Sequence, residues 1–92
     1  MNIRFKLYTS KNCPGCKVVK RHFDKAIVKI GLKAYKFETV VLDENYKGPI
    51  KGVPELHLND ELMIDGVPAY DRFLVMFDIK LQNFFRREAR KN

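Results

Sequence analysis

The chain has 92 residues, of which 46% are hydrophobic and 32% are charged. This length and composition predict a single globular domain, residues 1–92, whose core is large enough to fold without disulfide staples. Lys and Arg number 18 against 11 Asp and Glu, and the net charge of +7 favours anionic partners without choosing among proteins, small anions and nucleic acid. The longest apolar run, residues 73–77, is far too short to cross a membrane.

The first ten residues alternate apolar with polar or charged types and contain no apolar core of the kind found in a secretory signal. We therefore expect a cytoplasmic protein with no membrane partner. Thiols in that compartment are kept reduced, so a close cysteine pair there is more often catalytic or metal-binding than structural. A disulfide between Cys13 and Cys16 would close only a very small loop, which would stabilise the fold little.

Periodicity predicts the first elements in chain order. Residues 3–8 alternate between apolar and polar side chains, which indicates a strand. The apolar spacing after the cysteines predicts a helix from about residue 14 to residue 30, with Gly31 as its C-terminal cap. Residues 34–43 are rich in β-branched and aromatic types, which favours a second strand.

Two glycines and a proline lie within residues 44–52, and they argue against a stable helix there. We interpret this segment as an irregular connection. Residues 53–65 are typical of a hairpin with a polar turn. The turn is expected at Asn59 and Asp60, and the apolar residues expected on the two core faces are Leu56 and Leu58, then Leu62 and Ile64.

A helical stripe of apolar residues predicts a last helix over residues 69–89. The order is then strand, helix, strand, followed by strand, strand, helix. The first half is a right-handed unit with parallel strands, and the hairpin adds two antiparallel strands. The predicted class is α/β, with two helices packed on a four-stranded mixed sheet.

The cysteine pair lies where the first strand becomes a helix. Pro14 suits the first helical position, so Cys13 is expected at the helix tip, where unpaired N–H groups and the helix dipole favour a thiolate. Lys11 and Lys17 add positive charge nearby, and a lowered pKa is expected for the Cys13 thiol. Cys16 follows one turn later, further from solvent. We expect Cys13 to attack a substrate disulfide and Cys16 to release the product.

The segment YTSKNCPGC, followed by a helix and then by GVPELHLND about forty residues later, resembles the glutaredoxins and the wider thioredoxin-fold superfamily. The resemblance spans nearly the whole chain. It implies a thioredoxin/glutaredoxin-like fold and a thiol–disulfide oxidoreductase that reduces protein disulfides or glutathione mixed disulfides. It implies glutathione as co-substrate and no tightly bound cofactor.

The resemblance also implies roles for individual residues. Cys13 would be the nucleophile and Cys16 the resolving cysteine. Pro14 and Gly15 would shape the active-site turn, and Pro54 would be a cis proline beside the thiols. The backbone of Val53 would pair with the substrate like an added strand. Glutathione would be contacted by Lys11, Asp65 and Gly66.

The chain departs from the family in four places. Many glutaredoxins have Tyr at the position of Gly15. Their basic residue usually precedes the CxxC motif by three positions, whereas Lys11 precedes Cys13 by two. Asp65–Gly66 stands where two glycines are usual. The helix that normally follows the second strand is missing. The connection between the second and third strands must then pass over one intervening strand, a distance of about 10 Å. Nine extended residues reach about 30 Å, so the connection is long enough without the helix. We therefore predict a compact variant of the fold.

Other classes of function fit the residues less well. A protein-only zinc site needs four ligands, and His22 and His57 lie 35 positions apart, so we expect no metal site. An iron–sulfur cluster shared between two subunits, as in some glutaredoxins, ranks below disulfide exchange. The basic tail RREARKN is a weak signal for nucleic acid, which we do not expect as a partner.

The redox partners stay open at this point. The electron donor is expected to be glutathione. The alternative is thioredoxin reductase, if the chain has the shape of a glutaredoxin but is reduced as thioredoxins are. Disulfide-containing proteins are the expected clients, and ribonucleotide reductase is a common client of small redoxins. We expect the chain to act as a monomer.

Overall fold

A computed structural model describes residues 2–91 of the chain. Residues 43–54, all of them described, contain no helix, as predicted. The elements in chain order are β1 (Arg4–Ser10), α1 (Pro14–Ile30), β2 (Lys36–Leu42), β3 (Glu55–Leu58), β4 (Glu61–Asp65) and α2 (Tyr70–Arg90).

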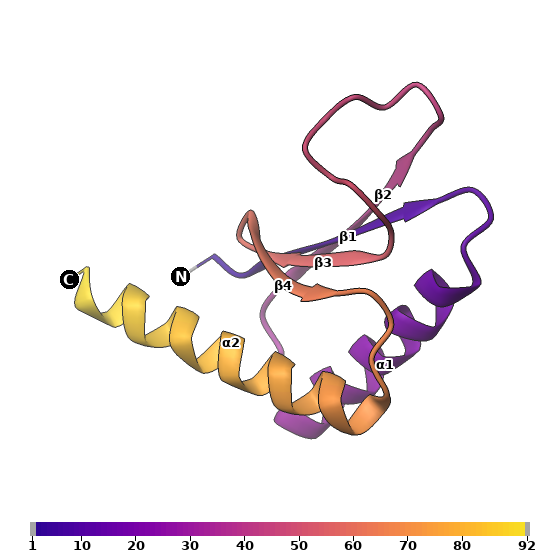
Figure 1. Ribbon diagram of the computed structural model, residues 1–92. Helices are drawn as coiled ribbons and strands as arrows, with labels where there is room; N and C mark the ends of the chain where they lie inside the picture. The colour runs from indigo at the N-terminus through magenta and orange to yellow at the C-terminus, as the bar shows by residue number, and fades with distance from the viewer. Residues whose placement is uncertain (1, 92) are drawn as a thin grey trace.

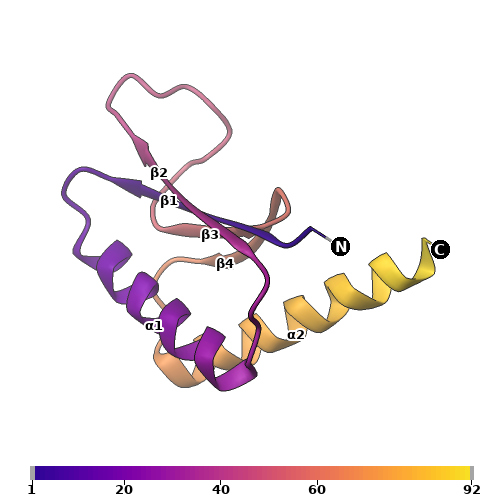
Figure 2. The ribbon, with the colours of Figure 1, turned by 180° about the vertical axis from the view of Figure 1, so that it is seen from behind.

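The four strands form one mixed sheet in the order β2-β1-β3-β4. β1 pairs in parallel with β2 and antiparallel with β3, and β3 pairs antiparallel with β4. Both helices cover the same face of the sheet (Figures 1 and 2). The connection between β2 and β3 projects on the side away from the helices, where Figure 1 shows it as an open loop. The predicted α/β architecture is therefore confirmed.

The alternation in β1 places every second side chain in the core. Ile3, Phe5 and Leu7 are buried, as their spacing predicts. Phe5 joins the layers, because its ring packs edge-on against Phe23 of α1 at 4.9 Å and stacks on Phe77 of α2 at 5.6 Å between centroids. Such aromatic contacts fix how the two helices lie on the sheet.

The ends of α1 follow from local chemistry. Pro14 occupies the first helical turn, where its missing N–H leaves no bond unmade. Gly31 adopts a left-handed conformation with φ of 82°, and its N–H donates to the carbonyl oxygen of Ile27 at 2.9 Å. The predicted limits of this helix and its glycine cap are confirmed.

Two predicted details of the strands were wrong. β2 is shorter than residues 34–43, because β1 supplies partners only from Arg4, opposite Lys36, to Ser10, opposite Leu42. In β4, Leu62 and Ile64 do not share a face. Leu62 is 48% exposed and Met63 is 2% exposed, because a register shift opposite Leu56 and His57 makes Met63 an extra residue that turns inward with Ile64.

Within residues 2–91, neither α1 nor α2 contains a stretch that is long and apolar enough to cross a bilayer.

Candidate active site

Cys13 and Cys16 are joined by a disulfide in this structure, with 5.3 Å between their Cα atoms. Cys13 is the N-cap of α1, and its Sγ accepts a hydrogen bond from the backbone N–H of Cys16 at 3.1 Å. An N-cap side chain that accepts from this turn satisfies one of the unpaired N–H groups of the helix. The same contact would favour negative charge on the Cys13 sulfur in the reduced protein.

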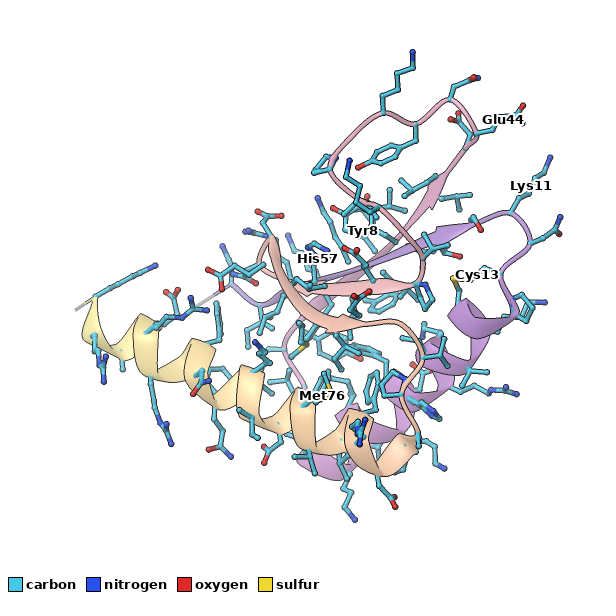
Figure 3. All side chains as sticks on the ribbon, in the orientation of Figure 1. Tyr8, Lys11, Cys13, Glu44, His57 and Met76 are labelled. Carbon is cyan, nitrogen blue, oxygen red and sulfur yellow. A yellow bond between two sulfur atoms is a disulfide. The ribbon has the colours of Figure 1, made fainter. Side chains whose placement is uncertain are left out.

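The two sulfurs differ in their access to solvent. Cys13 is half-buried, whereas Cys16 is 4% exposed. Disulfide exchange depends on which sulfur an incoming partner can reach, so Cys13 is the one that can meet a bulky substrate. Figure 3 shows Cys13 at the start of α1, with Lys11 pointing outward at the same end of the molecule.

The surroundings of the disulfide are positively charged. The first turn of α1 contains no acidic residue, so nothing there offsets the charge of Lys17 on the following turn. A groove of about 290 Å³ opens beside both cysteines. It is lined by Leu7, Thr9, Ser10, Lys11, Cys13, Cys16, Lys17, Lys20 and Thr39.

Pro54 lies on the other side of the cysteine turn. The Val53–Pro54 peptide bond is cis, and Pro54 is buried. A Cβ built on Gly15 would lie 3.8 Å from Pro54 Cδ, which places the proline ring against the backbone between the two cysteines. The carbonyl oxygen of Pro54 accepts from the N–H of Gly66 at 3.0 Å and so ties this turn to the end of β4.

No family model matches the chain. A curated relative from Archaeoglobus fulgidus, named "Probable Thioredoxin", is 35% identical over 69 residues, which cover 72% of this chain and 76% of the relative. The chain belongs to the thioredoxin family. A solved structure, glutaredoxin 1 from Francisella tularensis complexed with cacodylate, shares 17% identity with a TM-score of 0.49 and covers 91% of this chain and 98% of that one.

Membership of the thioredoxin family and the Cys13–Cys16 pair together give the coarse activity. The chain is a thiol–disulfide oxidoreductase with a thioredoxin/glutaredoxin-like fold. The strand order and the two helices on one face are those of a thioredoxin-family protein that lacks the helix after its second strand.

The structure brings some of the predicted site residues together and not others. Lys11 and both cysteines line one groove, while Gly15 and Pro54 meet beside it. The other four predicted residues are not part of the groove lining. Pro14 is exposed in the first turn of α1. Val53 is half-buried and makes no backbone–backbone hydrogen bond within residues 2–91, Asp65 is exposed at the end of β4, and Gly66 has φ of 76° with its N–H bonded to Pro54.

Val67 is a site residue that sequence reasoning missed. A Cβ on Gly15 would lie 2.6 Å from Val67 Cγ2, closer than real Cβ contacts come. Val67 therefore occupies the space that a side chain at position 15 would need, and 47% of it remains exposed beside the cysteine turn. No periodic pattern marks a residue in the connection after β4, so only the tertiary arrangement reveals it.

Thr9, Thr39 and Lys20 were also missed as groove residues. The alternation of β1 does place Thr9 on the core face with Leu7, and the parallel register sets Thr39 opposite Leu7. Pairing the two predicted strands residue by residue would therefore have predicted that both threonines lie near the cysteines.

Other polar clusters lie away from the cysteines. On the face opposite the helices, His57 Nε2 lies 2.9 Å from Glu55 Oε1, and its ring packs edge-on against Tyr8 at 4.8 Å (Figure 3). A hollow of about 400 Å³ lies between β4 and the end of α2 and has Glu61 and Arg87 in its lining. The Arg87 guanidinium, hydrogen-bonded to Glu61, lowers the pKa of that carboxyl. Among residues 2–91 no three His, Cys, Asp or Glu side chains gather as a metal site would require.

Proposed function

We propose that the chain reduces protein disulfides or glutathione mixed disulfides by dithiol exchange, with Cys13 as the nucleophile and Cys16 as the resolving cysteine. One observation carries the assignment of roles. Cys13 is half-buried and its sulfur accepts a hydrogen bond from the Cys16 N–H at the helix tip, whereas Cys16 is 4% exposed. Attack on an incoming disulfide is therefore assigned to the Cys13 thiolate.

The exchange proceeds in two steps. The Cys13 thiolate attacks one sulfur of the substrate disulfide, a mixed disulfide forms, and the other substrate sulfur leaves as a thiolate that takes up a proton. The Cys16 thiol loses its proton and attacks the Cys13 sulfur, which breaks the mixed disulfide and releases the second substrate thiol. The substrate gains two electrons, and the chain is left with the Cys13–Cys16 disulfide described above.

The backbone of Val53 is the proposed docking strand for the substrate. Its N–H and C=O have no backbone partner within residues 2–91, and it directly precedes Pro54, which packs against the cysteine turn. An extended substrate segment could pair with these groups as an added strand. Pro54 would then keep the substrate disulfide close to Cys13 without an N–H of its own to compete.

Two electron donors are proposed, and different residues favour each. Glutathione is favoured by Lys11, which lines the groove beside Cys13 and could meet a glutathione carboxylate. Asp65 and Gly66 are the further proposed contacts. Thioredoxin reductase is favoured by the curated relative, which is named a probable thioredoxin, and by the Gly66 N–H, which already donates to Pro54.

The same proposal includes the setting in which the chain works. It would act as a cytoplasmic monomer with no tightly bound cofactor, and ribonucleotide reductase is the first client protein to test by analogy with other small redoxins.

The experiment compares the wild-type chain with Cys13→Ser and Cys16→Ser. Each is assayed for reduction of a protein disulfide and of a glutathione mixed disulfide, with glutathione and with thioredoxin reductase as alternative donors. Cys13→Ser should abolish both activities, and Cys16→Ser should keep part of the mixed-disulfide activity because that route can run on one thiol. Activity that persists in Cys13→Ser would refute the proposed roles.

A further inference from the structure

The groove beside the cysteines lies on the opposite side of β1 from Pro54. It is built by β1, β2 and α1, whereas Pro54 and Val53 precede β3, and β1 stands between β2 and β3 in the sheet. The strand-like docking proposed at Val53 therefore leaves this groove unused. A substrate that crosses the disulfide would have one side on Val53 and the other in the groove.

The groove has an uncharged floor and a positively charged rim. Leu7, Thr9 and Cys16 form buried parts of its lining, and the charged residues that line it are three lysines, Lys11, Lys17 and Lys20. No carboxylate lines it within the described part of the chain. Lys20 is held in place by an ion pair with Asp24 at 2.6 Å and by the ring of Phe37, 4.8 Å from its ammonium group.

Lys11 and Lys17 are exposed, and no ion pair is formed by either within residues 2–91. Their charge is therefore available to a partner. A volume of about 290 Å³ lies at the small end of the range for ligand sites, about 300–1,000 Å³, so the groove suits one or two side chains of an extended segment.

We infer that this groove selects client proteins whose redox-active disulfide is flanked by Asp or Glu. The acidic side chains would lie against Lys11 and Lys17 while the client backbone pairs with Val53. Complementary charge of this kind chiefly speeds the encounter, and its effect falls as ionic strength rises. The inference rests on the proposed function, because it names the substrate class of the same cysteine site.

The test uses three synthetic peptide disulfides that differ only in the residues beside the cysteine, which are Glu, Ser or Lys. The second-order rate of their reduction by the pre-reduced chain is measured at low and at high salt. The acidic peptide should react about tenfold faster than the lysine peptide at low salt, and this ratio should fall towards unity at high salt.

Lys17→Glu is the decisive variant, and Lys33→Glu is its matched control. Both make the same change in net charge, but Lys33 lies outside the groove, in the segment between α1 and β2. Lys17→Glu should remove the preference for the acidic peptide over the serine peptide, and Lys33→Glu should preserve it. Comparison with the serine peptide corrects for any change in the reactivity of Cys13 itself.

The outcomes separate the two proposals. If all three peptides are reduced at equal rates, or if Lys33→Glu changes the ratio as much as Lys17→Glu does, the groove does not select clients and only this inference fails. If the wild-type chain reduces none of the peptides, the proposed function fails and the inference fails with it.

Discussion

Gly15 and Val67 show how one residue pair shapes the surface around the disulfide. A Cβ on Gly15 would lie only 2.6 Å from Val67 Cγ2, which is closer than two carbon atoms can pack. Many glutaredoxins have a tyrosine at the position of Gly15. Here the apolar surface beside the cysteines comes instead from the connection between β4 and α2.

This contact predicts a reversal in the effect of one substitution. Gly15→Ala should destabilise the wild-type chain by about 1 kcal/mol, because the half-exposed Val67 side chain must shift to make room for the new methyl group. With Val67→Ala already present, the same change should be neutral or stabilising by up to about 1 kcal/mol, since alanine is the better helix former. Urea unfolding of the four variants measures the coupling between the two sites. An equal effect in both backgrounds would contradict the assigned contact.

Gly31 allows a second prediction about a single residue. Its φ of 82° is costly for any residue with a Cβ, and no atom would crowd that Cβ. Gly31→Ala should therefore cost about 1 kcal/mol through backbone conformation alone. Gly52→Ala is the matched control, because Gly52 has open space and no positive φ, and it should be neutral or slightly stabilising. Equal losses of unfolding free energy in the two variants would argue against this explanation.

At the scale of whole elements, α2 is held on the sheet by one buried aromatic face. Phe77 is fully buried against Phe5, while Val75 on the same helix faces solvent. Phe77→Ala should lower the free energy of unfolding by about 3–5 kcal/mol, whereas Val75→Ala should change it by less than about 0.5 kcal/mol. Chemical denaturation followed by circular dichroism measures both. A small loss for Phe77→Ala would mean that α2 docks by other contacts.

The ion pair between Arg87 of α2 and Glu61 of β4 joins the same elements at the surface. The hydrogen bond from Arg87 lowers the pKa of Glu61, so the folded state is favoured above the ordinary glutamate pKa of about 4.3 and loses this support as the pH falls below it. Glu61→Gln should be slightly less stable than the wild type at pH 7 and equal to it near pH 2. Thermal unfolding across this range checks the trend, and a constant difference at every pH would refute it.

The elements also show how far the sequence predicts the fold. Both ends of α1 were predictable because Pro14 and Gly31 act locally. The inward turn of Met63 was not, because the register shift arises from pairing with β3 and the alternation of residues 61–65 gives no sign of it. The contact of Val67 with Gly15 was beyond prediction for a similar reason, since it joins the connection after β4 to the first turn of α1, far away in the sequence.

At the scale of the whole molecule, the connection of residues 43–54 takes the place of the missing helix between β2 and β3. It forms an open loop on the side of the sheet away from α1 and α2 (Figure 1). This connection is ordered by its own contacts, such as the hydrogen bond from the Ile50 N–H to the Tyr46 hydroxyl oxygen at 3.1 Å. The strand order survives without the helix because β1 alone separates β2 from β3, as the sequence predicts. The cysteine turn and Pro54 therefore still meet although that helix is missing.

The proposed mechanism assigns the attack on the substrate to Cys13 and the resolution of the intermediate to Cys16. The most direct test incubates pre-reduced Cys16→Ser with a protein disulfide and identifies the trapped adduct by mass spectrometry of its peptides. A stable mixed disulfide should form on Cys13 in this variant, and none should form with Cys13→Ser. An adduct on Cys16 that accumulates in Cys13→Ser at a comparable rate would contradict it.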